Sequence, residues 1–388
     1  MKYLHGGDIY RNPVQYDFSV NINPLGMPEG CQEAAKKGVD LAGQYPDWKG
    51  ERLVTGLAEA EGVKSGQLVL GNGAAELLYA LCFFLRPKKA LIPAPSFQEY
   101  EAAVRAAGGS VEFFYLQEEE DFVLTEERAE SLAEKIAGGS YDIVFLCQPN
   151  NPTGSVAAFE TVRRLAESCR RAGSVLCVDE CFLPFCREEA ELSAKGLLEE
   201  YDNLFILRAF TKIYGMPGLR LGYGMSGKNS FLKGVRSCIQ PWNTSLPAQM
   251  AGEQALRATG YVEKTRLFIE TGREFLDRQL RELAEAGKLK KVYPSQGNFI
   301  LFQAEKSLGQ ELLKKGILIR DCSNFEGLSE GYFRVAVRDR TANEALTEAI
   351  STVKSQNEEE EDSRSCMQEQ GKKLKTKLQD VRGSKDKK

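Results

Sequence analysis

A lysine and an arginine stand eight residues apart in a segment whose other residues are mostly apolar, small or turn-forming, Arg208-Ala-Phe-Thr-Lys212-Ile-Tyr-Gly-Met-Pro-Gly-Leu-Arg220-Leu-Gly-Tyr223. A lysine in such a setting loses solvation, so its pKa can fall and its amine can become a nucleophile. A nearby arginine can hold a phosphate, because its planar guanidinium is always charged. An amine that forms a Schiff base beside a phosphate anchor is what pyridoxal phosphate requires. A buried turn with two ordinary surface cations is the alternative, and this segment alone does not decide between them.

Two more polar residues, Asn151 and Asp179, resemble Lys212 in that each follows an apolar segment typical of a buried strand. Open α/β sheets bind ligands beyond the carboxyl ends of their strands, so the three side chains are expected at one edge. Asp179 precedes the apolar segment Phe182-Leu-Pro-Phe185 and has little access to water. It therefore needs a partner, and a protonated pyridine nitrogen is one. A helix cap or turn carboxylate is the alternative.

Two glycine-containing segments could approach an anion. Gly71-Asn-Gly73-Ala74-Ala75 lies between a short strand and an apolar helix, where free N–H groups form a phosphate site. It matches neither G-x-G-x-x-G nor a P-loop, so alone it is a weak signal. The only histidine, His5, precedes Gly6 and Gly7, which allow a close backbone approach to a ligand. A solvated N-terminal side chain is the alternative for His5.

The elements that must position these residues alternate along the chain. Helical patterning over 29–62 is broken at 44–47, and Thr125 is placed to cap a helix. Strands alternating with helices predict an α/β fold with a mostly parallel sheet sandwiched by helices. A smaller α+β domain follows, in which Arg334 stands mid-strand as either a solvated residue or a carboxylate clamp. A short strand, a glycine turn and an apolar helix are expected in that order from residue 67 to residue 80. The other expected strands are 90–93, 110–115, 142–147, 174–178, 204–207, 289–293, 298–302, 317–320 and 332–337, and the other expected helices are 97–107, 125–137, 158–171, 246–280, 307–315 and 341–354.

The chain is predicted to divide into an N-terminal arm (1–28), a large domain (29–245), a small domain (246–354) and a tail (355–388). The tail carries acidic and lysine-rich blocks without apolar periodicity, which predicts disorder. The 388 residues are 42% hydrophobic and 27% charged, with a net charge of −4, which gives no argument for nucleic acid or a membrane. Ten cysteines without a repeated spacing predict reduced thiols in the cytoplasm. With one histidine, no metal site is expected.

With Asn151, Asp179, Lys212 and Arg220 in that order, residues 1–354 resemble the fold-type I pyridoxal-phosphate enzymes, which include class I/II aminotransferases. The resemblance implies pyridoxal 5'-phosphate as the cofactor. Lys212 would bind it as a Schiff base and move protons, and Asp179 would keep the pyridine nitrogen protonated. The other implied cofactor contacts are Asn151 on the ring 3-oxygen, Phe97 stacked on the ring, and Gly73, Ala74, Ala75, Thr211 and Arg220 on the phosphate. Tyr45 would reach the cofactor phosphate of the partner subunit, which implies a homodimer.

Two residues depart from the family pattern. Phe182 stands where many aminotransferases have a tyrosine that contacts the 3-oxygen, so that hydrogen bond is absent here. Ala209 stands where a phosphate-binding serine is common. Phosphate anchoring is then expected to depend on Thr211, Arg220 and the glycine turn.

Within this family the likeness is greatest to the L-threonine-O-3-phosphate decarboxylases of cobalamin biosynthesis. The segments that carry it are His5–Asp8, Phe18–Gly26, Asp179–Phe182, Thr211–Tyr223 and Tyr332–Arg338. Histidinol-phosphate aminotransferases share much of this but usually carry the tyrosine at position 182 and lack the His-Gly-Gly start.

The resemblance implies decarboxylation of L-threonine O-3-phosphate to (R)-1-amino-2-propanol O-phosphate and carbon dioxide. Arg334 would bind the substrate carboxylate. His5, Asn23 and Arg338 are candidates for the substrate phosphate, and Gly6, Gly7 and Asn298 complete the expected substrate-binding set. An aminotransferase acting on histidinol phosphate or a related amino acid is the alternative. A catalytically silent binding protein on the same fold is an alternative of another class.

Overall fold

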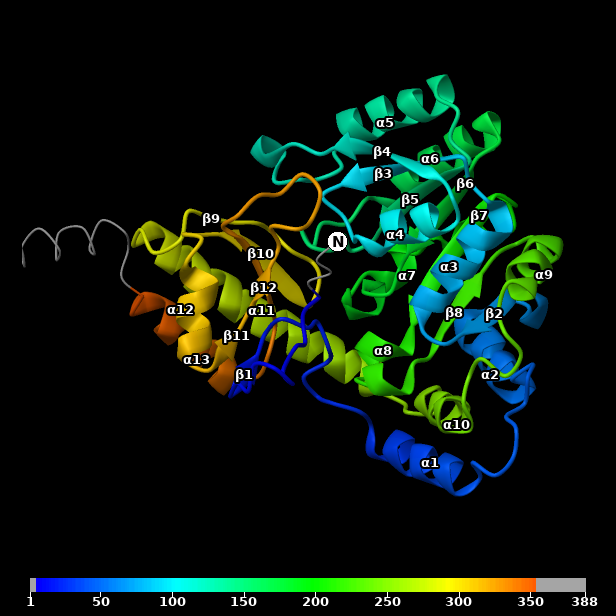
Figure 1. Ribbon diagram of the computed structural model, residues 1–388, viewed down its shortest axis with the longest axis horizontal. Helices are drawn as coiled ribbons and strands as arrows, with labels where there is room; N and C mark the ends of the chain where they lie inside the picture. The colour runs from blue at the N-terminus through cyan, green and yellow to red at the C-terminus, as the bar shows by residue number, and fades with distance from the viewer. Residues whose placement is uncertain (1–4, 354–388) are drawn as a thin grey trace, which may run out of the picture.

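The computed structural model describes residues 5–353, and its largest element is a seven-stranded sheet in the order β2-β8-β7-β6-β5-β3-β4 (Figure 1). Strands β3 to β7 pair in parallel, and β8 is antiparallel to both of its neighbours. The mostly parallel α/β sheet predicted from the sequence is therefore confirmed. The strands are β2 (Leu68–Gly71), β3 (Lys89–Ala94), β4 (Ser110–Tyr115), β5 (Ile143–Cys147), β6 (Val175–Asp179), β7 (Leu204–Ala209) and β8 (Gly222–Met225).

Helices cover both faces of this sheet. Side chains alternate along each buried strand, so each strand contributes to one core on either face. In β5, Val144 and Leu146 enter one core, while Phe145 and Cys147 enter the other. Helices on the first core are α1 (Glu29–Asp40), α2 (Glu51–Glu61), α5 (Glu126–Gly138), α6 (Phe159–Ala172) and α10 (Leu246–Ala255). Helices on the second core are α3 (Ala74–Leu85), α4 (Glu99–Ala106) and α9 (Asn229–Ser237). Thr125 caps α5 as expected, since its hydroxyl accepts from the Arg128 N–H.

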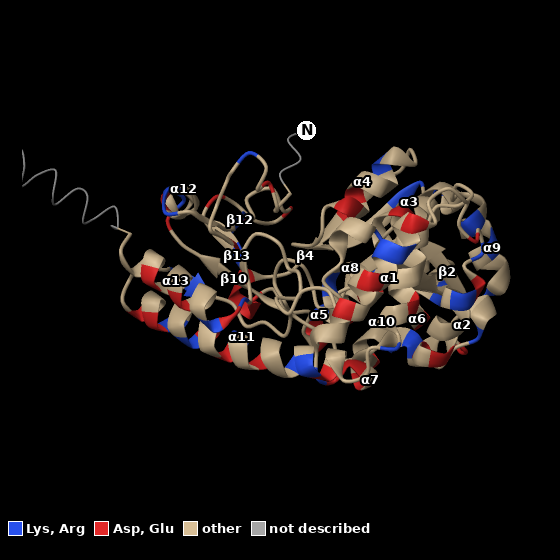
Figure 2. Cartoon of the chain, turned by 90° about the horizontal axis from the view of Figure 1, so that it is seen from below, with Lys and Arg blue, Asp and Glu red and all other residues tan. Residues whose placement is uncertain are grey.

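A second, antiparallel sheet has the order β12-β13-β10-β9. Phe302 and Val335 pack on one face of it against Leu280 and Leu346 from the helices. The elements are β9 (Lys291–Val292), β10 (Phe299–Gln303), β12 (Arg320–Asp321), β13 (Tyr332–Ala336), α11 (Tyr261–Glu285), α12 (Leu308–Lys314) and α13 (Arg340–Ser351). This is a small α+β unit, and acidic and basic residues are interspersed on its outer helices α11 and α13 (Figure 2).

The single helix expected over 246–280 is wrong, because the chain breaks between α10 and α11. Gly260 adopts φ = 73°, a left-handed conformation that glycine adopts at little cost. Ala248 of α10 packs in the core of the large sheet, whereas Leu276 of α11 packs in the small one. The domain boundary at 245 stays a prediction, and this packing favours a boundary between α10 and α11.

Two strands are found that the sequence did not indicate. The glycine-rich strand β8 lies beside β7, and a side chain at Gly224 would come within 2.4 Å of Phe205. Within the arm, β1 (Tyr16–Asp17) pairs in parallel with β11 (Ile317–Leu318), so the arm is joined to the small sheet's side of the molecule (Figure 1). The tail predicted at 355–388 lies outside the described residues. No helix within 5–353 combines the length and the apolar character that crossing a membrane requires.

Candidate functional site

A cavity of about 240 Å³ lies beyond the carboxyl ends of β5, β6 and β7, and we call it the Lys212 cavity. Residues from the arm, the large sheet and the small sheet line it. Most residues predicted for the site meet there, which places Asn151, Asp179 and Lys212 at one sheet edge as expected. The predicted residues that line it are His5, Gly6, Ala74, Ala75, Phe97, Asn151, Asp179, Phe182, Thr211, Lys212, Arg220 and Arg334.

Lys212 lies on the one-turn helix α8 (Phe210–Ile213), which follows β7 directly. Burial lowers the pKa of its amine to about 8, and the positive charge of Arg334 contributes to the shift. The ring of Phe182 lies 5.9 Å from Nζ and forms an apolar wall beside it. A neutral, nucleophilic amine is therefore accessible near neutral pH.

Asp179 is held by one hydrogen-bond donor on each carboxylate oxygen. The backbone N–H of Cys181 donates to Oδ1 at 2.9 Å, and the hydroxyl of Tyr100 donates to Oδ2 at 2.8 Å. Tyr100 is fully buried and stacks on Phe145 with ring centroids 5.0 Å apart. The carboxylate orientation is thus set by two rigid neighbours.

Groups that could bind an anion lie together where α3 begins beside Arg220. Gly73 precedes the helix at φ = 80°. Ala74 and Ala75 form the start of its first turn and line the cavity, and the backbone N–H groups of a first turn have no partner within the helix. A side chain at Gly73 would come within 2.6 Å of the Arg220 guanidinium, so only glycine leaves room for that group. Thr211 adds a hydroxyl, while Ala209 lines the cavity without a polar group.

Two arginines from the small sheet enter the same cavity. Arg320 and Arg334 are paired residues of β12 and β13, and both are buried. Arg334 donates to Asn151 Oδ1 and, at 3.0 Å, to the carbonyl of Ser19. Arg320 donates to the carbonyl of Asp321 and, at 2.9 Å, to Asn324 Oδ1. These hydrogen bonds all go to neutral acceptors, so the cavity contains two cationic groups whose charge a ligand can balance.

The arm closes one side of the Lys212 cavity. His5 forms a 3.2 Å contact with Glu99, and Gly6 lies beside it on the wall. Asn21 is 2% exposed and lines the cavity, yet neither its Nδ2 nor its Oδ1 has a partner among the described residues. A buried amide without partners is costly, so a ligand is the natural partner.

Six of the predicted residues are not in the cavity lining: Gly73 immediately precedes the lining residues Ala74 and Ala75, and the other five lie elsewhere. Asn23 and Arg338 are bonded within the protein: Asn23 donates to the carbonyl of Ile213, and Arg338 donates to that of Asp17. The N–H of Gly7 donates to Ser19 Oγ at 2.7 Å. Asn298 is fully buried outside the cavity lining, and Tyr45 is 77% exposed and stacked on Trp242.

Three residues of the site were not predicted from the sequence, and two of them, Arg320 and Asn21, had a partial signal. Arg320 ends an otherwise apolar strand segment, Ile317-Leu-Ile-Arg320, which marks a buried charge. Asn21 lies two residues from Asn23, but a tight turn from Ile22 N–H to the Val20 carbonyl decides which of the two faces the cavity. Tyr100 gave no signal, since only the packing of α4 brings it to Asp179.

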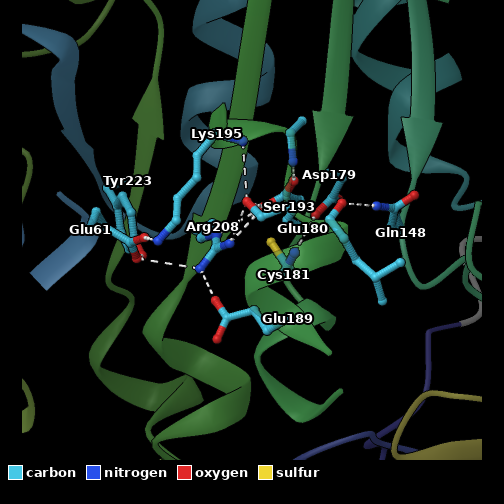
Figure 3. Close-up of polar contacts among 12 residues, drawn as sticks. Glu61, Gln148, Asp179, Glu180, Cys181, Glu189, Ser193, Lys195, Arg208 and Tyr223 are labelled. Carbon is cyan, nitrogen blue, oxygen red and sulfur yellow. Dashed lines mark hydrogen bonds and ion pairs between the residues drawn. The ribbon is translucent and has the colours of Figure 1, made fainter. Parts of the chain in front are cut away.

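A polar network lies behind the ends of β6 and β7 (Figure 3). Arg208 of β7 donates to Glu180 at 2.7 Å and to Ser193 at 2.9 Å, and it also pairs with Glu61 and Glu189. Burial alone would lower the pKa of Arg208, but these carboxylates raise it well above its usual value. The network joins the strand that carries Asp179 to the strand that precedes Lys212.

Comparison with known proteins places the chain among relatives. The family described as aminotransferase class I and II matches residues 13–381. A protein of Caldanaerobacter subterraneus subsp. tengcongensis, provisionally named threonine-phosphate decarboxylase, is 38% identical over 90% of this chain and 93% of its own. The threonine-phosphate decarboxylase of Salmonella typhimurium is 33% identical, over 90% and 96%.

A solved structure, the histidinol-phosphate aminotransferase from Clostridium acetobutylicum, superposes with a TM-score of 0.79 at 32% identity. It covers 86% of this chain and 98% of its own. The fold and the matched sequence agree over most of the chain, and the protein belongs to the aminotransferase class I and II family.

Proposed function

We propose that this protein binds pyridoxal 5'-phosphate and decarboxylates L-threonine O-3-phosphate to (R)-1-amino-2-propanol O-phosphate and carbon dioxide. The choice of substrate rests on Arg320 and Arg334, two buried guanidiniums in the cavity that also contains Lys212. An amino acid with both a carboxylate and a phosphate satisfies both charges.

The assignment of the two anions follows from the neighbours of each arginine. Arg334 contacts Asn151, at the sheet edge near Lys212, so it is suited to the carboxylate beside the reacting carbon. Arg320 is left for the substrate phosphate, with His5 and Asn21 on the arm as further donors. Burial lowers the pKa of Arg334 to about 10, so it stays charged near neutral pH.

The residues of the cavity fit pyridoxal phosphate. The α3 amides, Thr211 and Arg220 would supply donors for its phosphate, and the absence of a side chain at Gly73 lets the Arg220 guanidinium lie beside the start of α3. Asp179 would bind the ring nitrogen, Asn151 the 3-oxygen, and Phe97 would stack on the ring. When bound, the cofactor supplies an electron sink for the bond that breaks at the substrate Cα.

Within this chain, Lys212 is the group that moves a proton. Its amine would hold the cofactor, and as a free ammonium group it would deliver a proton to the substrate Cα that carbon dioxide has left. The ring of Phe182 covers one side of that amine and limits its contact with water. Arg334 orients the carboxylate, and the geometry that it imposes selects the bond that breaks.

A homodimer in the cytoplasm is part of the same proposal. Tyr45 and Trp242 stack with ring centroids 4.5 Å apart, and they are 77% and 46% exposed. An exposed pair of large aromatic side chains is typical of an interface. Tyr45 would cross it to the cofactor phosphate of the second subunit.

An aminotransferase on histidinol phosphate is the second candidate, favoured by the superposition on the Clostridium acetobutylicum enzyme. Histidinol phosphate has a phosphate but no carboxylate, so it would leave Arg334 without a charged partner. Both reactions use Lys212 and Asp179, and those two residues therefore do not separate them.

The test incubates the purified protein and cofactor with L-threonine O-3-phosphate and measures carbon dioxide. In parallel, glutamate formation is measured from histidinol phosphate and 2-oxoglutarate. Carbon dioxide release without glutamate formation is expected. Glutamate formation without carbon dioxide would establish the aminotransferase. A protein that takes up no cofactor, with no absorbance near ~420 nm, would be a silent binding protein instead.

A further inference from the structure

The helix that carries Lys212 is too short to be stable without contacts to other parts of the protein. Helix α8 has four residues, Phe210–Ile213, and a single turn is unstable without external contacts. Its last carbonyls point out of the helix and need donors from elsewhere. The Gly215 N–H after the helix donates to the Lys212 carbonyl at 3.2 Å, and the arm adds further donors through one residue, Asn23.

Asn23 contacts both carbonyls at the end of α8. Its backbone N–H donates to the Lys212 carbonyl at 3.1 Å, and its Nδ2 donates to the Ile213 carbonyl at 2.7 Å. The side chain is 2% exposed, and its Oδ1 accepts from the Leu25 N–H at 3.0 Å, which fixes its rotamer. A main-chain and a side-chain donor from one residue thus cap the Lys212 turn.

The same side chain reaches a third segment, α11. Nδ2 of Asn23 lies 2.8 Å from Thr265 Oγ1 and 3.0 Å from the Tyr261 hydroxyl. Tyr261 in turn donates to the Gly26 carbonyl. A side chain at Gly215 would come within 2.5 Å of the Gly26 backbone, so the arm lies directly on the turn after α8. In Figure 1 the arm runs from α1 to β1 past the end of α11 that is nearest α8.

We propose that Asn23 is a positioning residue that clamps the Lys212 turn to the arm and to α11, and so holds the Lys212 amine in its buried place. Asn21, two residues earlier, lines the cavity, so one short stretch of arm both faces the ligand and fixes the lysine. The inference needs only that Lys212 binds the cofactor. It does not depend on which substrate is used.

The test compares Asn23→Ala with Asn203→Ala. Asn203 is a matched control: its Nδ2 also bridges two carbonyls, those of Ala166 and Ser174, but it precedes β7 at the end remote from Lys212. The rate at which the ~420 nm band forms on adding pyridoxal phosphate to the cofactor-free protein is measured against pH. In the wild type its midpoint is expected near 8.

Loss of the clamp admits water to Lys212, so the midpoint in Asn23→Ala should rise toward the ordinary lysine value of about 10.4. The kcat for the proposed substrate should fall by roughly 10- to 100-fold with little change in KM. Both variants should lose thermal stability, but Asn203→Ala should keep the wild-type midpoint and kcat. Thr265→Val removes one partner of Asn23 and should show a smaller shift of the midpoint in the same direction. It replaces Asn23→Ala in the test if Asn23→Ala does not fold.

An unchanged midpoint in folded Asn23→Ala or Thr265→Val would overturn the proposal. A raised KM at constant kcat would also overturn it, since Asn23 would then act on the substrate. If the wild type gives a normal midpoint but no carbon dioxide, the proposed function fails while this inference stands.

Discussion

Lys212 and Arg334 are two cations in one buried cavity, and this controls the chemistry of the lysine. Burial and the charge of Arg334 both disfavour the ammonium form, which lowers the pKa of Lys212 to about 8. The neutral amine therefore becomes populated as the pH rises through about 8, well below the range of an exposed lysine.

Replacing Arg334 should change that titration. In Arg334→Gln one like charge is removed, so the pKa of Lys212 should rise, and formation of the ~420 nm band should need a higher pH. KM for the substrate should also increase, because the carboxylate loses its partner. Arg338→Gln is the control, since Arg338 donates to the Asp17 carbonyl outside the cavity. An unshifted midpoint in Arg334→Gln would contradict the coupling.

Tyr100 acts on Asp179 through one hydrogen bond. Burial and the nearby Asp179 raise the pKa of Tyr100 well above its usual value, so it remains a donor at any working pH. Tyr100→Phe should cost about 1–3 kcal/mol in urea unfolding, because Asp179 Oδ2 loses its partner. It should also lower kcat, which Tyr293→Phe should not, although the Tyr293 hydroxyl is a comparable buried donor to Glu118. Equal kcat in both variants would assign Tyr100 to stability alone.

At the scale of elements, the site depends on how strands and helices end. Asp179 ends β6, and Lys212 follows β7 by three residues. The ion pair of Glu180 with Arg208 ties these two strand ends together from behind. Arg208 also forms ion pairs with Glu61 and Glu189, which lie on two other segments. These ion pairs hold the sheet edge in place without a ligand.

The start of α3 can be tested at Gly73. Gly73→Ala places a methyl group within 2.6 Å of Arg220 and strains a residue at φ = 80°. Gly62→Ala also places an alanine at a positive φ, 68°, but in the milder left-handed helical region and with nothing within 4 Å. Both should lose about 1–3 kcal/mol of stability, but only Gly73→Ala should weaken pyridoxal-phosphate binding, by about tenfold or more in a fluorescence titration. Equal affinities in the two variants would exclude the expected role of this turn.

At the scale of the whole molecule, the Lys212 cavity exists only where the large sheet, the small sheet and the arm meet. Arg334 links all three parts, because it lies on β13 and donates to both Asn151 of the large unit and Ser19 of the arm. The exposed pair of Tyr45 and Trp242 lies away from this cavity, on the surface that we assign to the second subunit.

The dimer can be tested with light scattering after size exclusion, where the wild type should have twice the mass of one chain. Tyr45→Ala should raise the dissociation constant of pyridoxal phosphate about tenfold or more, as expected for losing a hydrogen bond to a charged group. Leu267→Ala, at an exposed apolar residue of α11, should change neither property. A monomeric wild type with full activity would overturn the assembly and the role of Tyr45.

The parallel sheet and the three residues at its edge could be predicted from the sequence. Strand periodicity is local, and parallel strands bring their carboxyl ends together, so Asn151, Asp179 and Lys212 could be placed without coordinates. Helix α11 and its break from α10 were less predictable, because one glycine divides two segments with the same periodicity.

Only the tertiary structure decided which side chains reach the ligand from the arm and the small sheet. A tight turn over residues 20–22 has Asn21 at its centre. Asn21 lines the cavity and Asn23 contacts the Lys212 turn, although both are asparagines two positions apart. The pairing of β12 with β13 brings in Arg320 and not Arg338. Residue type and spacing indicate that a side chain can bind an anion, but its direction depends on turns and register set by distant parts of the chain.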